Sequence, residues 1–293
     1  KMSLVTLKEV LRESVERRYA VGAFDTASYQ NTAAILKAAE QTGTPMILMV
    51  TWGMIEEQEK PGEYVKLTLE MIRNAGVPVA LHLDHGGSFE DCMKAIHAGF
   101  SGVMFDGSSL PMEENIRITK KVTEAAHACG VSVEAEIGHV GGAEGGALLK
   151  DGAVADSANF TTPEEAVRFV EATGVDALAV AIGTVHGIYR GTPKLDLKRL
   201  SDIRSQVDIP LVMHGGSGLT PEAFRGAVEH GINKINFFTG MSLAAAGAVK
   251  ETVAKAGDRP IHMQEIQEAA DRAVTEIVKE HIEIFQTQPL IGC

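Results

Sequence analysis

Three histidines stand where a metal could be bound. His85, His186 and His214 each follow a short apolar run, and each lies next to a glycine. A single histidine in such a position would more often be an ordinary hydrogen-bonded loop residue. Three neutral imidazoles with an open fourth position are the ligand set of a catalytic zinc ion or a similar divalent metal. We therefore predict that these three histidines bind one metal ion.

The residues beside this predicted metal centre allow two roles. Asp84 directly precedes His85 and is either a general acid and base or a carboxylate that orients a metal-bound histidine. His82 lies two residues earlier, so it shares a strand face with Asp84 and is predicted to be an interior histidine. Lys234 offers a rival mechanism, covalent catalysis through a Schiff base. That mechanism would leave the three histidines without a role.

A second group of residues, all glycines or small polar residues, could bind an anion. These residues are Gly187, Gly215, Ser217, Asn236 and Thr239. They could be no more than tight turns, but backbone N–H groups and hydroxyls at helix N-termini also bind phosphate. We predict a phosphate site here.

Eight short apolar runs position these residues. They cover residues 20–24, 45–50, 78–83, 102–105, 132–137, 177–182, 210–213 and 232–235. Amphipathic segments of helical period lie between most of them, which predicts a parallel sheet. Eight such units in 293 residues favour one (β/α)8 barrel domain over residues 1–293 rather than an open, doubly wound sheet. In such a barrel the residues after the strands share one rim, which is where active sites lie.

Two further segments and the composition complete this prediction. Residues 138–160 are rich in glycine and suit a mobile loop, and residues 263–287 predict one or two extra C-terminal helices outside the barrel. The net charge of −12 argues against nucleic-acid and anionic-membrane partners. No apolar run approaches the ~20 residues of a membrane span. Three scattered cysteines predict reduced thiols in a cytoplasmic protein.

Several motifs together resemble one enzyme family. They are His-Leu-Asp-His-Gly at 82–86, Gly-Phe-Ser-Gly-Val-Met-Phe-Asp-Gly-Ser at 99–108, Val-Glu-Ala-Glu-Ile-Gly at 133–138, Ala-Val-Ala-Ile-Gly-Thr-Val-His-Gly at 179–187, His-Gly-Gly-Ser-Gly at 214–218 and Lys-Ile-Asn at 234–236. Over residues 4 to 285 the chain resembles the class II fructose-bisphosphate and tagatose-bisphosphate aldolases, nearest the shorter tagatose-type branch.

The resemblance implies a role for each residue of the site. A zinc-type metal would bind His85, His186 and His214, with Asp106 and Glu136 lining the metal site as possible alternate ligands. Asp84 would exchange the proton of the C4 hydroxyl, and Glu144 would handle the proton on the dihydroxyacetone phosphate carbon. The phosphate would lie on Gly187, Gly215, Ser217, Asn236 and Thr239, beside a monovalent cation such as Na⁺ or K⁺.

The implied activity is the reversible cleavage of a ketose 1-phosphate or 1,6-bisphosphate. The products would be dihydroxyacetone phosphate and an aldehyde, within glycolysis or related carbohydrate metabolism. The resemblance also predicts a homo-oligomer, either a dimer or a tetramer. The remaining alternatives are a metal-dependent sugar-phosphate epimerase on the same scaffold and a barrel kept only as a regulatory or scaffold subunit.

The chain departs from the family pattern in three places. Phe-Asp-Thr-Ala-Ser at 24–28, Val-Thr-Trp-Gly-Met at 50–54 and Asp-Arg-Pro at 258–260 replace the usual stretches. All three concern the end of the substrate that is distant from the metal. Arg259 either still reaches a second phosphate in a neighbouring subunit, or the substrate ends differently, with a sulfonate, a carboxylate or no charge.

Overall fold

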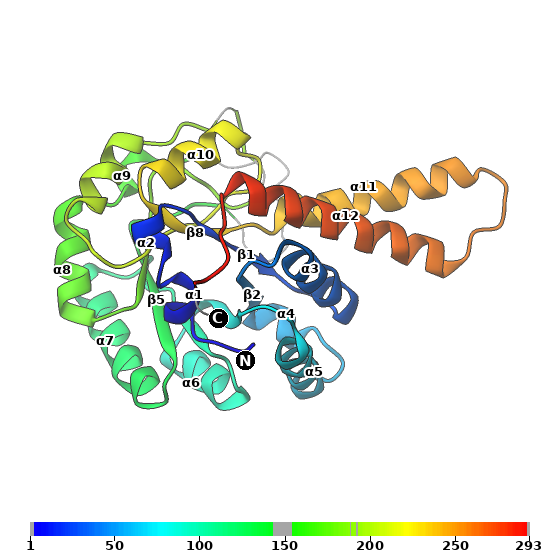
Figure 1. Ribbon diagram of the computed structural model, residues 1–293. Coiled ribbons are helices and arrows are strands. Elements are labelled where there is room, and N and C mark those ends of the chain that lie inside the picture. The colour runs from blue at the N-terminus through cyan, green and yellow to red at the C-terminus, as the bar shows by residue number, and fades with distance from the viewer. Residues whose placement is uncertain (1–2, 143–153, 188, 192, 292–293) are drawn as a thin grey trace.

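Eight parallel strands of the described chain close into a barrel in sequence order, as predicted (Figure 1). The computed structural model describes residues 3–142, 154–187, 189–191 and 193–291. The strands are β1 (Val21–Asp25), β2 (Met46–Thr51), β3 (Val79–Gly86), β4 (Gly102–Phe105), β5 (Ser132–Ile137), β6 (Ala177–Val180), β7 (Leu211–Met213) and β8 (Ile232–Asn236). β8 pairs with β1 and completes the barrel.

Helices surround the barrel on its outer side (Figure 1). They are α1 (Leu7–Leu11), α2 (Ser14–Arg17), α3 (Tyr29–Thr42), α4 (Trp52–Glu56), α5 (Pro61–Asn74), α6 (Phe89–Ala98), α7 (Met112–Ala128), η1 (Ser157–Asn159), α8 (Pro163–Thr173), α9 (Leu197–Arg204), α10 (Pro221–Glu229), α11 (Thr239–Ala256) and α12 (Met263–Ile284). Polar N-cap side chains fix where several begin, since Ser28, Ser88, Thr162 and Thr220 each accept a hydrogen bond from an amide of the first turn.

Apolar packing closes the end of the barrel where the strands begin. Leu7, Val10 and Leu11 of α1 are fully buried or nearly so, and they pack with inward-facing residues of the strands. Many of those strand residues are small, such as Ala80 and Ala177. Because this packing fills the end where the strands begin, the polar residues of the barrel interior lie toward the other end.

The last two helices form an antiparallel pair that projects from the barrel, here called the arm (Figure 1). α12 packs against α3, where Thr275 Oγ1 donates to the backbone oxygen of Ala34 at 3.1 Å, and Val278 and Ile282 of α12 are buried. Residues 263–287 were predicted to hold one or two helices, and they hold one. α11 over residues 239–256 is the helix of the eighth strand–helix unit. Every helix in the described part of the chain lacks the length and apolar character that crossing a membrane requires.

His281 offers a test of how α12 docks. It is 8% exposed, and its ring centroid lies 3.8 Å from that of Phe237. Burial lowers its pKa below the usual value of 6.5, so in mild acid the unfolded chain binds more protons than the folded chain. The free energy of unfolding should therefore fall as the pH drops below that value. In His281→Phe the fall should be smaller by up to about 1.4 kcal/mol per pH unit.

Urea unfolding at about pH 7.5 and about pH 5.5 measures this difference. His97→Asn is the control, because the side chain of His97 is exposed on α6. Equal pH dependence in His281→Phe and the original chain would show that protonation of His281 does not oppose docking of α12.

Candidate active site

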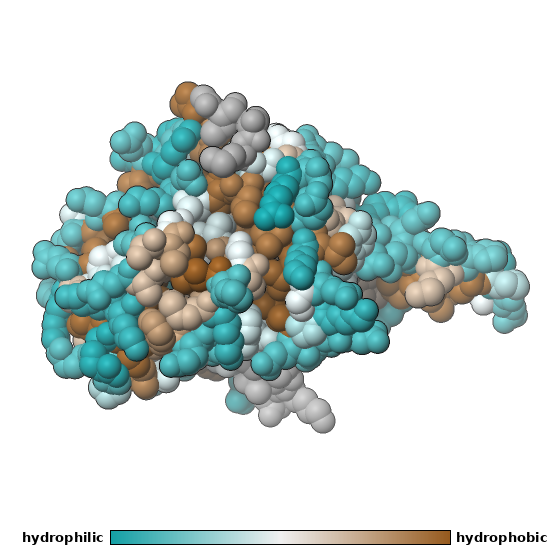
Figure 2. Space-filling view, turned by 90° about the horizontal axis from the view of Figure 1, so that it is seen from below, coloured by the Kyte–Doolittle hydropathy of each residue, from teal (hydrophilic) through white to brown (hydrophobic). Residues whose placement is uncertain are grey.

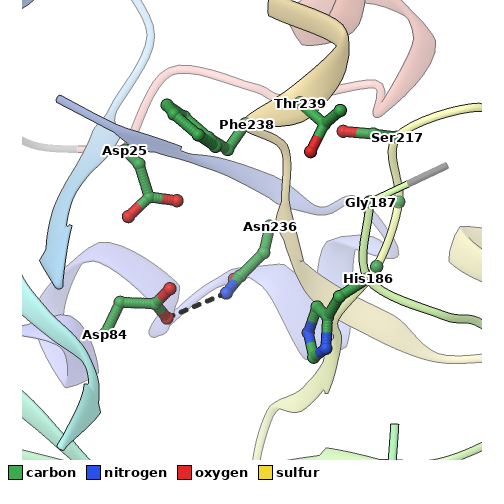
Figure 3. A pocket seen from close by; sticks show the side chains of 10 residues that line it. Asp25, Asp84, His186, Gly187, Ser217, Asn236, Phe238 and Thr239 are labelled. Atoms are coloured by element: carbon green, nitrogen blue, oxygen red, sulfur yellow. Dashed lines mark hydrogen bonds between the residues drawn. The ribbon is translucent and has the colours of Figure 1, made fainter. Parts of the chain in front are cut away.

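A pocket opens at the end of the barrel where the strands finish (Figure 3). β1, β3 and β8 contribute Asp25, Asp84 and Asn236, and the segments that follow β6, β7 and β8 contribute the rest. The lining residues are Asp25, Asp84, His186, Gly187, Gly215, Gly216, Ser217, Asn236, Phe238 and Thr239. Residues from segments far apart in the sequence therefore meet at one rim, as the barrel prediction requires.

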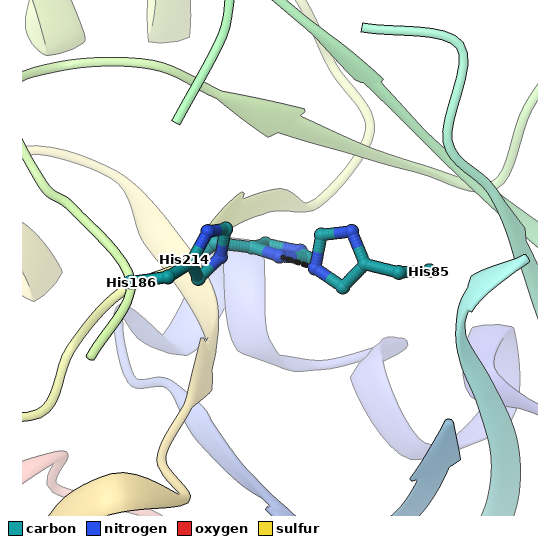
Figure 4. Close-up of side chains that lie close together, drawn as sticks. All are labelled: His85, His186 and His214. Atoms are coloured by element: carbon teal, nitrogen blue, oxygen red, sulfur yellow. Dashed lines mark hydrogen bonds between the residues drawn. The ribbon is translucent and has the colours of Figure 1, made fainter. Parts of the chain in front are cut away.

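The three predicted histidines lie together at this rim (Figure 4). One ligand atom from each of His85, His186 and His214 lies within 4.8 Å of the others. His85 has a positive φ of 45°, which is uncommon for a residue other than glycine, and the pairing of β3 with β4 shifts register at this point. Such an irregularity re-aims a side chain, and here the His85 ring faces the other two.

Carboxylates determine which ring nitrogens of His85 and His214 carry protons. His85 Nδ1 lies 2.7 Å from Asp106 Oδ2, and His214 Nε2 lies 2.9 Å from Glu134 Oε1. Burial raises the pKa of Asp106, but the hydrogen bond and charge of His85 outweigh it and hold that pKa well below its usual range. Burial likewise raises the pKa of Glu134, and the charge of Lys234 with the hydrogen bonds from histidines outweighs it. Both carboxylates therefore accept, and the two histidine nitrogens donate.

The inner nitrogens of the same two rings face one another, and each offers a lone pair when its ring is neutral. His85 Nε2 and His214 Nδ1 are 2.8 Å apart. Two acceptors this close require a cation or a shared proton between them. With His186 as the third imidazole, the donor set fits a divalent metal of the zinc type. His85, Asp106 and Glu136 form a second group whose ligand atoms lie within 4.8 Å of one another.

Asp84 and His82 lie on the same inward face of β3, as their spacing predicted. Asp84 is buried at the rim, and its Oδ1 accepts a hydrogen bond from Asn236 Nδ2 at 3.0 Å. His82 lies deeper and is fully buried, with its Nε2 3.3 Å from Glu134 Oε2. Lys234, the Schiff-base candidate, is also fully buried, and its Nζ contacts Glu134 and Asn236 instead of lining the pocket. This placement argues against a Schiff base.

The five predicted phosphate-binding residues all line the pocket. Gly215 must be glycine, because φ is +67° and an added Cβ would lie 2.3 Å from the backbone oxygen of Val185. Asn236 differs from the other four, since its side chain turns toward Asp84 (Figure 3). Gly187, Gly215, Ser217 and Thr239 are called the cradle below.

Tyr189 was missed by the sequence analysis. Its hydroxyl donates to the backbone oxygen of Gly215 at 2.7 Å and accepts from the amide of Val185 at 3.2 Å. It thereby joins the loop after β6 to the loop after β7. A tyrosine in a loop gives no sequence signal for such a bridge.

Two predicted residues lie elsewhere. Glu144 is outside the described residues. Arg259 lies in the turn between α11 and α12 at the tip of the arm, half exposed and ion-paired to Glu265 at 2.8 Å (Figure 1). Within one chain Arg259 is therefore remote from the pocket.

Comparisons with known proteins agree with this site. Residues 5–289 match the family described as class-II fructose-bisphosphate aldolase. The chain is 42% identical to a fructose-bisphosphate aldolase of Staphylococcus epidermidis over 98% of both chains. It is 45% identical to one of Geobacillus stearothermophilus over 87% of both. The crystal structure of the YdjI aldolase of Escherichia coli K12 is similar, with 32% identity, a TM-score of 0.84, and coverage of 97% of this chain and 98% of that one.

The contact between His85 and Asp106 can be tested directly. Removing the carboxylate in Asp106→Ala frees the His85 ring to rotate and to change its tautomer. Zinc affinity should therefore fall by roughly 10–100-fold, measured by calorimetric titration of the metal-stripped protein. Asp202→Ala, which removes an exposed carboxylate on α9, is the matched control. Unchanged affinity in Asp106→Ala would mean that Asp106 does not orient a metal ligand.

Proposed function

Because the chain belongs to the class II fructose-bisphosphate aldolase family, and is therefore an aldolase and a carbon–carbon lyase, we propose that it reversibly cleaves a ketose 1-phosphate or 1,6-bisphosphate to dihydroxyacetone phosphate and an aldehyde. The observation that carries this proposal is the meeting of three histidines, Asp84 and the cradle at one rim. Membership of the family argues against the epimerase and scaffold alternatives.

His85, His186 and His214 would hold the divalent metal, with zinc the first candidate. When bound, the metal supplies Lewis acidity to the C2 carbonyl oxygen, which gains negative charge as the C3–C4 bond breaks. Asp106 and Glu136, which with His85 form the second group, would offer alternate ligands. Na⁺ or K⁺ beside the cradle would offset part of the phosphate charge.

Asp84 would take the proton of the C4 hydroxyl. As the C3–C4 bond breaks, its electron pair stays on C3, the C4–O bond becomes a carbonyl, and the hydroxyl proton passes to the carboxylate. Asn236 holds Oδ1 of this buried carboxylate and so fixes its orientation. Glu144 would return a proton to C3.

The cradle would hold the phosphate of the dihydroxyacetone half. Among the described residues its lining offers no lysine or arginine, so the donors would be backbone N–H groups and the hydroxyls of Ser217 and Thr239. Backbone donors at the start of a helix bind phosphate without a basic side chain. The acidic net charge of the chain is therefore compatible with an anionic substrate.

A specific observation favours a second candidate for the aldehyde half. Asp25 and Asp84 face the pocket across from the cradle (Figure 3). Two carboxylates oppose an anion at that end unless a cation is brought in. The second candidate is a ketose 1-phosphate without a second phosphate. Of the termini open to it, the two carboxylates favour an uncharged one over a sulfonate or a carboxylate. A preference for the tagatose configuration remains a prediction, since the relatives above are named for fructose bisphosphate.

The arm would join copies of the chain into a dimer or a tetramer. Three of its apolar side chains are exposed in a single chain, Leu243 at 48%, Val253 at 46% and Met263 at 79%, and Figure 2 shows apolar surface on the arm. Exposed apolar surface of this kind marks interaction sites. Arg259 does not reach the pocket of its own chain. If a second copy packed on the arm, Arg259 would lie near the pocket of that copy.

Asp84→Ala tests the assignment of the proton carrier. The variant should lower kcat for cleavage by roughly 10²–10⁴-fold while metal content stays near that of the original chain. Chelation of the original chain should abolish activity, and zinc or cobalt should restore it. If Asp84→Ala loses its metal and recovers its rate in excess metal, Asp84 only orients a ligand. Full activity after chelation, or borohydride trapping at Lys234, would refute metal dependence.

A substrate comparison tests the distal end. We would compare kcat/KM for fructose and tagatose bisphosphates with that for ketose 1-phosphates, and measure assembly by light scattering. If a bisphosphate is favoured by about 10²-fold or more and Arg259→Ala removes that preference without changing assembly, Arg259 binds the second phosphate. If the ketose 1-phosphates react equally well or better, the second candidate is correct.

A further inference from the structure

A buried lysine lies between the proposed proton carrier and the proposed metal ligands. Lys234 of β8 is fully buried inside the barrel. Its Nζ lies 2.9 Å from Glu134 Oε2, 3.1 Å from Glu134 Oε1 and 2.7 Å from Asn236 Oδ1. An ammonium has three N–H donors and no acceptor. Two of these donors bond to Glu134 Oε1 and Asn236 Oδ1, and the ammonium is also ion-paired with Glu134 Oε2.

One branch of this network runs to Asp84. Because Asn236 Oδ1 accepts from Lys234, the amide nitrogen of the same side chain points the other way and donates to Asp84 Oδ1 at 3.0 Å. A flipped amide would place NH₂ against the ammonium and a carbonyl against the carboxylate, which are two repulsive contacts. Lys234 thus decides which way the amide faces, and the amide holds the carboxylate of Asp84.

The other branch runs to His214. Glu134 Oε1 accepts from His214 Nε2 at 2.9 Å, which leaves His214 Nδ1 facing His85. Lys234, Glu134 and His214 are each fully buried. A single ion pair therefore reaches both the proton carrier and a metal ligand.

Stability alone does not account for an ion pair in this place. Taking two charges out of water costs about as much as their attraction returns, and apolar residues of similar volume would often stabilise a core as well. Branched apolar residues dominate the interior of such barrels. What the ion pair adds is a fixed orientation for the groups that it contacts.

We propose that Lys234 is a positioning residue that acts through Asn236 to fix the Asp84 carboxylate, an inference that rests on the proposed function. It does not touch the substrate and forms no covalent bond. Without it, the Asn236 amide rotates and Asp84 loses a defined donor. The step that needs Asp84, proton transfer at the C4 hydroxyl, then slows. Proton exchange at the carbon of dihydroxyacetone phosphate does not use Asp84 and should continue.

The test uses a double variant. Lys234→Met alone would leave the Glu134 carboxylate buried without its cation, so it is combined with Glu134→Gln, whose amide oxygen still accepts from His214. We expect kcat for cleavage to fall about 10- to 100-fold. With zinc in excess, deuterium exchange from water into dihydroxyacetone phosphate should stay within about threefold.

A double-mutant cycle with Asn236→Ala shows whether Lys234 acts through Asn236. Asn236→Ala should reproduce the selective loss of cleavage. Adding the double variant to Asn236→Ala should cost little more, because the route from Lys234 to Asp84 is already broken. Asp176→Asn is the matched control. It weakens another buried carboxylate, which lies just before β6 and is bonded to His127 at 2.7 Å, and it should leave both rates unchanged.

Each outcome decides between the alternatives. Cleavage at the original rate in the double variant overturns the proposal. So does a proportional loss of cleavage, exchange and zinc binding, which would indicate general structural damage. An additive loss on top of Asn236→Ala would show that Lys234 does not act through Asn236. If the original chain itself neither cleaves ketose phosphates nor exchanges the proton, the proposed function fails, and the positioning role fails with it.

Discussion

The pairing of β8 with β1 is the constraint on which the rest of the structure depends. Val21 pairs with Lys234, and Ala23 pairs with Asn236. This pairing closes the barrel. The side chains of Lys234 and Asn236 then point into the barrel interior, as do side chains of β3 and β5. Since side chains alternate along a strand, closure places residues of one parity together inside. Asp84, Glu134 and Asn236 meet for this reason, although up to 152 positions separate them in the sequence.

The barrel interior is divided into two parts with different physical requirements. Small apolar residues and α1 fill the end where the strands begin. Charged and polar residues fill the other end, where burial would be costly if each group were alone. They offset that cost by bonding to one another, as Glu134 does with His214 and Lys234. This arrangement requires that the buried polar groups keep fixed distances and orientations. Proton transfer and metal binding require the same.

The arm follows a different logic. α11 carries its apolar residues around much of its surface, and in one chain several of them face solvent. Arg259, the cation that could serve the distal end of a substrate, lies at its tip beside Glu265. In the proposed function, residues of one chain would bind the dihydroxyacetone half. Recognition of the aldehyde half would depend on Asp25 and on whether another chain contributes.

The sequence by itself determined the strands, the barrel and the rim. Short apolar runs, capping residues and glycines are local signals, and they predicted that His85, His186, His214 and the cradle would converge. The tertiary structure alone decided the finer arrangement. It showed the projecting arm, the bridge made by Tyr189, the amide of Asn236 turned toward Asp84, and Lys234 held by Glu134. Periodicity records whether a residue is buried. Which nitrogen meets which oxygen depends on strand register and barrel closure, and these bring together residues from distant strands.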